Sequence, residues 1–360
     1  MTAYIEKGDA ELLRLSLDKP VGGSGVASVD VILVELTTTD GMLGRGLSYV
    51  LGSSGILPLA VARNMISSFV NNKPIQHPEN LSRNILKTFN RTGLGPNMIG
   101  LAAIDTAMWD LYATLLDCPV GIAMGGDFRE VKVYGSGGFN TDQSPDEVAI
   151  QARKYIDSGV SAVKVRVSGQ RSDELVLEAV SDAIGDRADL MLDANEKCDL
   201  ASATRLVELS KNFGVLFLEE PLPAGDIFGY RSLASNNNGI ISLGEHLQGL
   251  SEAKIFMADH LCSVMQPDLA MMGGLTESLK VARFAETTGV SVSPHFLPNI
   301  FVHLAAASPS ITWLEDFPLL EVLFRDQTTY DKNGNLSLPK EPGLGIKWNE
   351  EAIIQYKVDL

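Results

Sequence analysis

The sequence predicts an α/β protein in which an N-terminal α+β domain precedes a parallel βα barrel. Residues 11–50 alternate apolar and polar side chains with a period of two, which is typical of an antiparallel sheet with one solvated face. From residue 131 onward, short apolar runs alternate with helical stretches through seven to eight units. Several of these runs end in acidic side chains. Acids spread over consecutive strand ends suit a closed (β/α)7-8 barrel of the TIM type better than the alternative, a doubly wound open sheet.

The predicted N-terminal domain covers residues 1–126. Three alternating runs are expected to form its sheet, with a turn at Asp40-Gly41 before the last of them: residues 12–17, 29–36 and 43–50. A glycine-rich loop, residues 18–25, is expected to be mobile and lacks the glycine patterns that cradle nucleotide phosphates. Helical stretches follow over about residues 57–71, 79–90 and 97–117. The last is small and apolar on most sides, so it is expected to pack between layers.

The predicted barrel covers residues 127–318, after a boundary marked by Gly125-Gly126. Its expected strands end near Gly137, Val167, Asn195, Glu220, Glu245, Asp268, His295 and Glu315. After Glu315 the βα rhythm is lost. Residues 319–360 are expected to return and cover the first domain.

Three acidic side chains recur in step along the barrel. Asp193, Glu219 and Glu245 each follow a short apolar run and are spaced twenty-six residues apart, about the length of one strand, crossover helix and strand. They should therefore lie at the same level on three neighbouring strands. Clustered carboxylates repel one another unless a cation neutralises them, and an all-oxygen site suits Mg²⁺ rather than zinc. A single acid would more often be a loop carboxylate or helix N-cap, but three in register predict a metal site.

Lys164 and Arg166 stand two residues apart in one apolar run. A strand points both to the same face, while Val163, Val165 and Val167 face the helices. Two cations aimed into a barrel indicate an anion between them, so both are candidate substrate-binding and catalytic groups. The alternative is a pair of rim charges that reach for solvent.

His295 ends the strand that follows the one ending in Asp268. Adjacent strand ends would place the carboxylate against an imidazole nitrogen, which fixes the tautomer and raises the basicity of the ring, as a general base near pH 7 requires. A histidine without an acid in register would more often be structural or lie on the surface. That is the expectation for His77, His246, His260 and His303.

Composition narrows the class of protein. The chain has 360 residues, 45% hydrophobic and 21% charged, which is typical of a soluble globular protein. Its net charge of -16 offers no basic stripe to attract phosphate, so nucleic acid and anionic membranes are not expected as partners. Without a long apolar run or a signal-peptide core, a cytoplasmic location is expected. The cysteines lie far apart and are expected to be reduced: Cys118, Cys198 and Cys262.

Taken together, these features resemble the enolase superfamily, and specifically its mandelate racemase subgroup. The resemblance covers nearly the whole chain, including a capping domain before Gly126 and the closing segment Pro342-Gly-Leu-Gly345. It lies in an ordered set of motifs across the barrel: Lys164-Val-Arg166, Asp193-Ala-Asn195, Leu218-Glu-Glu-Pro221, Gly244-Glu245, Gln266-Pro-Asp268, Ser293-Pro-His295 and Trp313-Leu-Glu315.

The resemblance implies roles for the matched residues. Asp193, Glu219 and Glu245 match the ligands of one Mg²⁺ ion per site. His295 with Asp268 matches the base dyad of the subgroup. The chain is therefore expected to use magnesium and one histidine base.

Further matches surround these groups. Glu315 matches the acid that donates a hydrogen bond to the developing enediolate, Asn195 a polar substrate-binding position beside the metal, and Glu220 a supporting acid. Lys164 matches the first residue of the usual Lys-x-Lys pair. The second position, normally the opposing base, holds Arg166, whose guanidinium is a poor base. This departure argues against two-base racemisation.

The reaction implied by the resemblance is Mg²⁺-dependent removal of the proton alpha to a carboxylate, followed by loss of water from a hydroxy or sugar acid to leave a 2-keto acid. One alternative is a racemase or epimerase of a 2-hydroxy acid, and another is a non-catalytic sugar-acid binding protein. Substrate identity is expected to depend on residues 19–25, where Lys19 is a candidate substrate-binding cation, and on residues 50–56. A homo-oligomer that acts on a small-molecule acid is expected.

Overall fold

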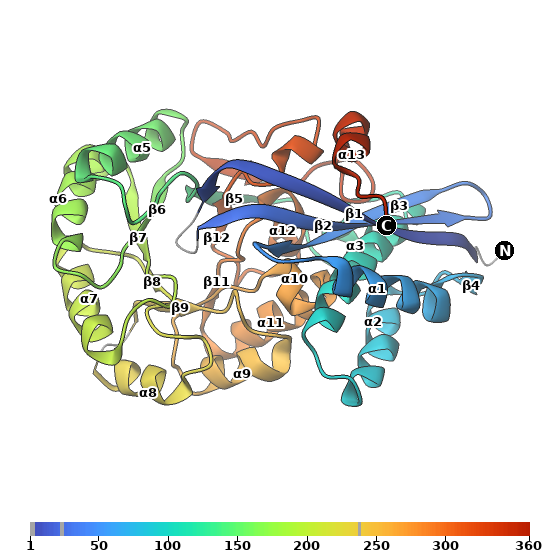
Figure 1. Cartoon of the computed structure of the whole chain (residues 1–360), viewed down its shortest axis with the longest axis horizontal. Helices are drawn as coiled ribbons and strands as arrows, with labels where there is room; N and C mark the ends of the chain where they lie inside the picture. Colours follow the sequence, from blue (N-terminus) through green and yellow to red (C-terminus); the bar gives the residue numbers. More distant parts are fainter. Residues whose placement is uncertain (1–3, 22–24, 237–238) are drawn as a thin grey trace.

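The computed structural model describes residues 4–21, 25–236 and 239–360, without the side chains of residues 18, 19 and 236. A barrel of parallel strands lies beside a smaller sheet formed by the N-terminal strands (Figure 1). The C-terminal helix packs against that smaller sheet. The predicted combination of an α+β domain and a parallel barrel is confirmed.

The N-terminal sheet is antiparallel, with strand order β3-β2-β1-β4. Its strands are β1 (Tyr4–Val21), β2 (Val26–Thr38), β3 (Leu43–Leu51) and β4 (Lys73–Pro74). The prediction of a loop from residue 18 was wrong for residues 18–21, because β1 pairs with β2 as far as Val21 after a register shift beyond Ser16. Side-chain alternation does not reveal a ladder that continues through such a shift.

Helices α1 (Ile56–Met65) and α3 (Pro96–Leu115) pack on this sheet, and α2 (Pro78–Leu86) packs on α3. A π turn (Ile66–Val70) extends α1, and a 3-10 turn (Lys87–Asn90) extends α2. On its other side α3 contacts the barrel helix α10 (Leu269–Met272), so the predicted packing between layers is confirmed.

Gly46 on β3 permits the close approach of α3 to the sheet. A Cβ atom at this position would stand 2.1 Å from the backbone nitrogen of Ala107 and 2.6 Å from the carbonyl oxygen of Ala103. Both neighbours are backbone atoms of the helix, so neither can rotate away. Only glycine lets the two elements lie at this separation.

In the described chain, eight parallel strands form the barrel, in the order β11-β10-β9-β8-β7-β6-β5-β12. They are β5 (Glu130–Gly135), β6 (Ala162–Arg166), β7 (Asp189–Asp193), β8 (Leu218–Glu219), β9 (Ile241–Leu243), β10 (Val264–Met265), β11 (Ser291–Val292) and β12 (Trp313–Asp316). Backbone hydrogen bonds from Val292 to Ser310 (2.8 Å) and from Thr312 to Val292 (3.0 Å) join β11 to the residues before β12 and complete the ring.

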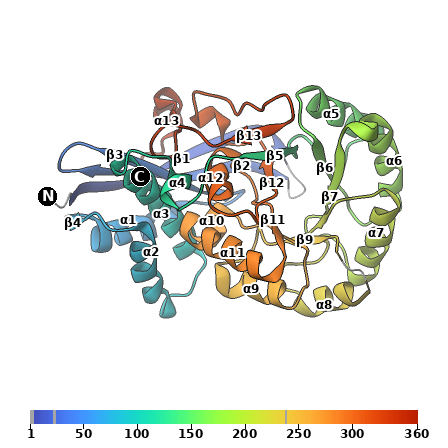
Figure 2. The same cartoon turned by 180° about the vertical axis from the view of Figure 1, so that it is seen from behind.

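Helices cover the outside of this ring (Figure 2). They are α5 (Pro145–Asp157), α6 (Asp173–Ile184), α7 (Leu200–Asn212), α8 (Ile227–Asn236), α9 (Leu250–Ala258), α11 (Leu275–Thr288) and α12 (Pro298–Ala307). Short pieces are α4 (Val120–Ala123), before the barrel, and a 3-10 turn (Gly185–Arg187) after α6. In the part of the chain that is described, β12 leads into a 3-10 turn (Glu321–Leu323) rather than an α-helix. The barrel is therefore of the (β/α)7β kind.

The C-terminal segment contacts both parts of the molecule. β13 (Asn335–Ser337) pairs antiparallel with β5. Farther along, α13 (Glu350–Tyr356) contacts β1, and the backbone N–H of Val358 donates to Leu12 at 2.8 Å. Along the chain, the C-terminal segment therefore pairs with the barrel before it reaches the N-terminal sheet.

Two further features belong to the chain as a whole. Its three cysteines are free: Cys118, Cys198 and Cys262. Among the described residues, none of the helices is both long enough and apolar enough to cross a bilayer.

Candidate active site

Lys164 and Arg166 on β6 point into the barrel, and both are buried. Lys164 Nζ lies 2.6 Å from Glu219 Oε2, 2.8 Å from Glu315 Oε1 and 3.7 Å from Asp193 Oδ2. Arg166 forms an ion pair with Asp193. Burial lowers the pKa of each cation, but the surrounding carboxylates outweigh it and hold both pKa values above their ordinary range. Neither residue is therefore a rim charge that reaches for solvent.

The three acids predicted to bind metal follow neighbouring strands. Asp193 ends β7 and lies in register with Glu219 at the end of β8, and Glu245 follows β9. Glu219 Oε2 accepts a hydrogen bond from Gln266 at 2.5 Å, whereas Oε1 is buried with no hydrogen-bond partner among the described residues. Burial and repulsion from Asp193 raise the pKa of Glu219 well above its usual range. A divalent cation would satisfy the lone oxygen, and a set of three carboxylates fits Mg²⁺.

Asn195 orients one of these acids through its backbone. Its N–H donates to Asp193 Oδ1 at 2.8 Å, with the residue in the left-handed region at φ 46°. The side chain of Lys19, the other predicted substrate-binding group, lies outside the described part of the chain.

His295 and Asp268 form a hydrogen-bonded pair. His295 Nδ1 lies 2.8 Å from Asp268 Oδ2, and the two residues form a parallel bridge between adjacent strand ends. The other ring nitrogen, Nε2, lies 3.2 Å from Glu245 Oε2. Burial lowers the pKa of His295, but the carboxylates of Glu245 and Asp268 outweigh it and raise the pKa to about 10. The dyad thus lies in contact with Glu245, a predicted metal ligand.

Sequence reasoning missed Tyr49 on β3. Its hydroxyl donates to Asp268 Oδ2, the same oxygen that His295 Nδ1 approaches, and its ring packs edge-on against Phe296 at 5.2 Å between centroids. The N-terminal domain therefore contributes directly to the dyad. Nothing in the sequence marks Tyr49, because it fits an ordinary alternating strand.

Glu315 at the end of β12 accepts a hydrogen bond from the backbone of Phe296 at 2.9 Å and pairs with Lys164. Although burial raises its pKa, the charges of Lys164 and His295 lower the pKa of Glu315 to about 2. The role implied by the resemblance, donating a hydrogen bond, requires a protonated carboxyl. In these surroundings the carboxylate holds the Lys164 ammonium in place, and the donation of a hydrogen bond by Glu315 stays a prediction.

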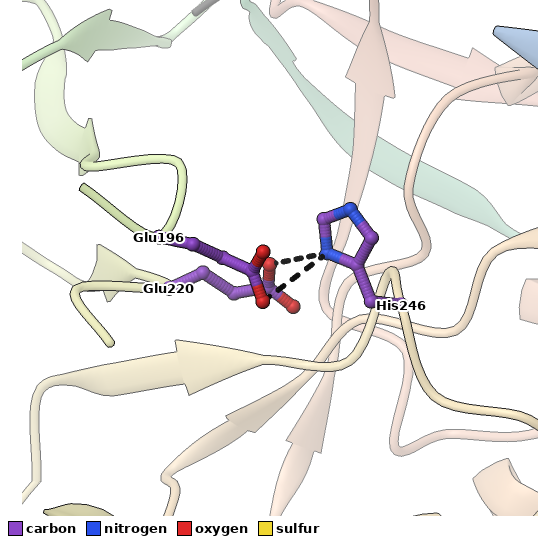
Figure 3. Close-up of side chains that lie close together, drawn as sticks. All are labelled: Glu196, Glu220 and His246. Atoms are coloured by element: carbon purple, nitrogen blue, oxygen red, sulfur yellow. Dashed lines mark hydrogen bonds and ion pairs between the residues drawn. The ribbon is translucent and has the colours of Figure 1, made fainter. Parts of the chain in front are cut away.

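The expectation that His246 lacks an acid partner was wrong. His246 Nδ1 lies 2.6 Å from Glu220 Oε2 and 4.0 Å from Glu196 Oε1, and the two carboxylates approach the same edge of the ring (Figure 3). Each of these three residues offers one possible metal-ligand atom, and the three atoms lie within 4.8 Å of one another. The hydrogen bond to Glu220 raises the pKa of His246 to about 10.

Backbone conformation explains why this partner was overlooked. Alternation along a strand would turn Glu219 and Glu220 to opposite faces, yet the Glu220 carboxylate meets His246, which follows β9 at the mouth of the barrel. Glu220 leaves β8 with φ 35° and Glu196 has φ 59°, both in the left-handed region. The backbone N–H of Gly244 then donates to Glu220 Oε1 at 3.1 Å and anchors the carboxylate beside His246.

A cavity of about 210 Å³ opens between the N-terminal domain and the mouth of the barrel. Four residues of the barrel with polar side chains line this cavity: Glu245, His246, Asp268 and His295. The N-terminal domain contributes Tyr49 and apolar side chains, among them Val50 and Leu51, which belong to residues 50–56, the segment expected to influence specificity. The arrangement can bind a small organic acid beside two imidazoles.

Two protein-family models match the chain. The N-terminal domain of the mandelate racemase/muconate lactonizing enzyme family matches residues 20–125, and the enolase C-terminal domain-like model matches residues 147–352. Both matched ranges contain residues that line the cavity.

Several curated proteins are similar over most of the chain. L-talarate/galactarate dehydratase of Salmonella typhimurium is 28% identical over 329 residues, 91% of this chain and 82% of that protein. D-gluconate dehydratase of Thermoproteus tenax is 30% identical over 350 residues, 91% of this chain and 70% of that protein. D-galactarolactone cycloisomerase of Agrobacterium fabrum is 26% identical over 352 residues, 91% of each chain.

Solved structures agree with these similarities. The Salmonella typhimurium dehydratase liganded with Mg and L-lyxarohydroxamate has a TM-score of 0.92 at 28% identity and covers 100% of this chain and 94% of that chain. L-talarate dehydratase from a Polaromonas species, complexed with Mg and L-glucarate, has a TM-score of 0.91 at 27% identity, over 99% and 98% of the two chains.

Proposed function

Since the chain belongs to the mandelate racemase/muconate lactonizing enzyme family of the enolase superfamily, we propose that it is a Mg²⁺-dependent enzyme that dehydrates an acid sugar to a 2-keto acid. Relatives at 28 and 30% identity are dehydratases of such acids, and two structural neighbours are complexed with Mg and acid-sugar ligands or analogues. The observation that carries the proposal is the His295–Asp268 pair, which stands beside Glu245 at the wall of the cavity.

His295 is the proposed base. Asp268 accepts the hydrogen bond of Nδ1–H at 2.8 Å, which leaves Nε2 as the ring atom that takes the alpha proton of the substrate. Among the groups that raise the pKa of the ring, Glu245 contributes most, and Mg²⁺ held by Glu245 would offset that carboxylate and leave the imidazole able to accept a proton. The hydroxyl of Tyr49 holds Asp268 from the other domain and so limits rotation of the carboxylate. The ring is thereby presented to the cavity in one tautomer and one orientation.

Asp193, Glu219 and Glu245 would hold Mg²⁺, which when bound supplies positive charge against the negative charge that develops on the substrate carboxylate. Lys164 adds a buried ammonium at the same end of the barrel, held by Glu219 and Glu315. A preorganised charge in a site that excludes water stabilises a developing anion more than it would in solution.

Dehydration is favoured over racemisation because the site offers one good base. A racemase needs a proton acceptor on each face of the alpha carbon. Arg166 stands at the position of a second base, where a guanidinium stays protonated, and the Lys164 ammonium is held in ion pairs by Glu219 and Glu315. His295 alone then accepts the alpha proton. The electrons of the broken C–H bond expel the hydroxyl on the neighbouring carbon.

The test is a panel of acid sugars incubated with the protein and Mg²⁺ in D2O, with 2-keto acid and deuterium at the alpha carbon both measured. We expect 2-keto acid from at least one substrate and its loss on chelation of the metal. His295→Asn should lose both signals, whereas Asp268→Asn should keep a remnant. Inversion of the alpha centre without 2-keto acid would replace the dehydratase with a racemase, and binding without any exchange would indicate a sugar-acid binding protein.

A further inference from the structure

We propose that the substrate is a monocarboxylic acid sugar whose chain ends in a methyl group, that is, a deoxy sugar acid. This inference rests on the dehydration proposed above and narrows its substrate class. Acid sugars can end in a methyl group, a hydroxymethyl group or a second carboxylate. The side chains around the cavity at the mouth of the barrel distinguish among these three ends.

The cavity has a polar side and an apolar side. The polar side consists of the four barrel residues that include His295 and Asp268. The apolar side, here called the apolar wall, comes from β3, α3 and α10, which contact one another. Its residues are Val50, Leu51, Ile99, Ala270 and Met271. All but Ala270 are half-buried, so their side chains keep a surface that a ligand can contact.

The positions of the proposed metal ligands set the direction of the substrate. Asp193 and Glu219 are buried at the ends of β7 and β8, beside the Lys164 ammonium, and Glu245 lines the cavity. The substrate carboxylate therefore belongs at the buried end, and the alpha carbon lies against His295. The remaining carbons extend into the cavity, away from the buried cations and toward the apolar wall.

Asp268 connects the base to the apolar wall. Its Oδ2 lies 2.8 Å from His295 Nδ1, and its Oδ1 accepts the backbone N–H of Met271 at 2.8 Å. One carboxylate thus fixes the position of the wall relative to the base. In a cavity of about 210 Å³, a substrate that meets His295 must place its far end against this wall.

The hydroxyl groups that β3 brings to this region are bonded to protein atoms. Tyr49 donates its hydroxyl to Asp268, and Ser48 Oγ donates to the carbonyl oxygen of Ile99 at 2.6 Å. The side chains of the apolar wall carry no hydroxyl, amide or charged group. A terminal hydroxyl of the substrate would lose its hydrogen bonds to water there, and a second carboxylate would lose more. A methyl group leaves water favourably.

The test uses six-carbon acids in sets that differ only at C6, such as 6-deoxy-L-galactonate, L-galactonate and galactarate, with one set for each configuration that is dehydrated. In the wild type, kcat/KM for the methyl form should exceed that for the hydroxymethyl form by about tenfold to a hundredfold, and that for the dicarboxylate by more. Calorimetry on His295→Asn with Mg²⁺ should give the same order of affinity without turnover.

Met271→Gln tests the apolar wall directly, because it changes the side-chain volume little and adds an amide that can bond a terminal hydroxyl. The ratio of kcat/KM for the methyl and hydroxymethyl forms should fall by about tenfold. Met271→Leu keeps the wall apolar and should keep the ratio. Met42→Gln is the matched control, since Met42 is also half-buried but lies outside the cavity. The ratio compares two substrates of one protein, so a general loss of activity cancels.

Three outcomes decide between this inference and the proposed function. A wild type that prefers the hydroxymethyl form or the dicarboxylate would overturn the methyl terminus. A ratio that stays unchanged in Met271→Gln would show that the end of the substrate does not meet the apolar wall, and would also overturn it. A wild type that makes no 2-keto acid from any form would overturn the dehydratase, while the order of affinities in His295→Asn would still test the methyl terminus.

Discussion

Glu219 is the proposed metal ligand whose buried Oε1 has no hydrogen-bond partner among the described residues. Glu219→Gln keeps the shape of the side chain and removes its charge. The affinity for Mg²⁺ should fall by at least about tenfold, as measured by isothermal titration calorimetry. The exposed Glu174→Gln serves as the matched control. Undiminished affinity in Glu219→Gln would remove this residue from the metal site.

Tyr49 offers a second prediction at the residue scale. Tyr49→Phe keeps the edge-on contact with Phe296 but removes the hydrogen bond to Asp268. A hydrogen bond to a charged group contributes about 1.5 to 3 kcal/mol, so kcat and alpha-proton exchange should fall together by about tenfold or more. Mg²⁺ affinity should not change. The control is Tyr4→Phe at an exposed ring, and exchange at the wild-type rate in Tyr49→Phe would show that the dyad does not need this bond.

Packing of α3 on β3 links two elements to the position of the site. In Gly46→Ala the new Cβ would meet backbone atoms of α3 at 2.1 and 2.6 Å, so the strand or the helix must shift. The free energy of unfolding should fall by about 1 to 3 kcal/mol in urea titrations. Since β3 also carries Tyr49, kcat should fall as well.

Gly225→Ala is the matched control for this prediction, because a Cβ at Gly225 would meet nothing within 4 Å. Its stability and activity should stay at wild-type values. If Gly46→Ala were as stable as Gly225→Ala, the close approach of the two elements would be looser than the structure shows.

At the scale of the whole molecule, His303 on α12 joins three parts of the chain. Its Nδ1 accepts from the backbone of Gly121, before the barrel, and its Nε2 donates to Leu344 in the C-terminal segment at 3.0 Å. Burial lowers the pKa of His303 to about 4. Between pH 6.5 and 4 the unfolded chain therefore binds more protons at this residue, and stability falls as the pH falls.

The pKa difference corresponds to about 3 kcal/mol of stability lost by pH 4. The measurement is the free energy of unfolding in urea for wild type and His303→Gln across this pH range. The variant should be less stable at neutral pH, where its contacts are lost, and the difference between the two proteins should shrink as the pH falls. A difference that stays constant from pH 7 to pH 4 would contradict a neutral, buried His303.

The sequence by itself determined the features that depend on neighbouring residues. The period of two in the N-terminal strands, the βα rhythm of the barrel and the acids at strand ends all follow from side-chain direction within one element. The twenty-six-residue step placed Asp193 and Glu219 on adjacent strands, where they lie in register. Residues one βα unit apart could therefore be paired, as Asp268 and His295 were.

Only the tertiary structure decided the contacts that cross domains or break the strand pattern. Tyr49 reaches Asp268 across 219 residues, a meeting that depends on how the N-terminal sheet docks on the barrel and not on any local period. Glu220 reaches His246 because a left-handed φ turns it inward where strand alternation would turn it out. Alternation describes regular backbone alone, so a single residue in the left-handed region is enough to reverse the direction that it predicts.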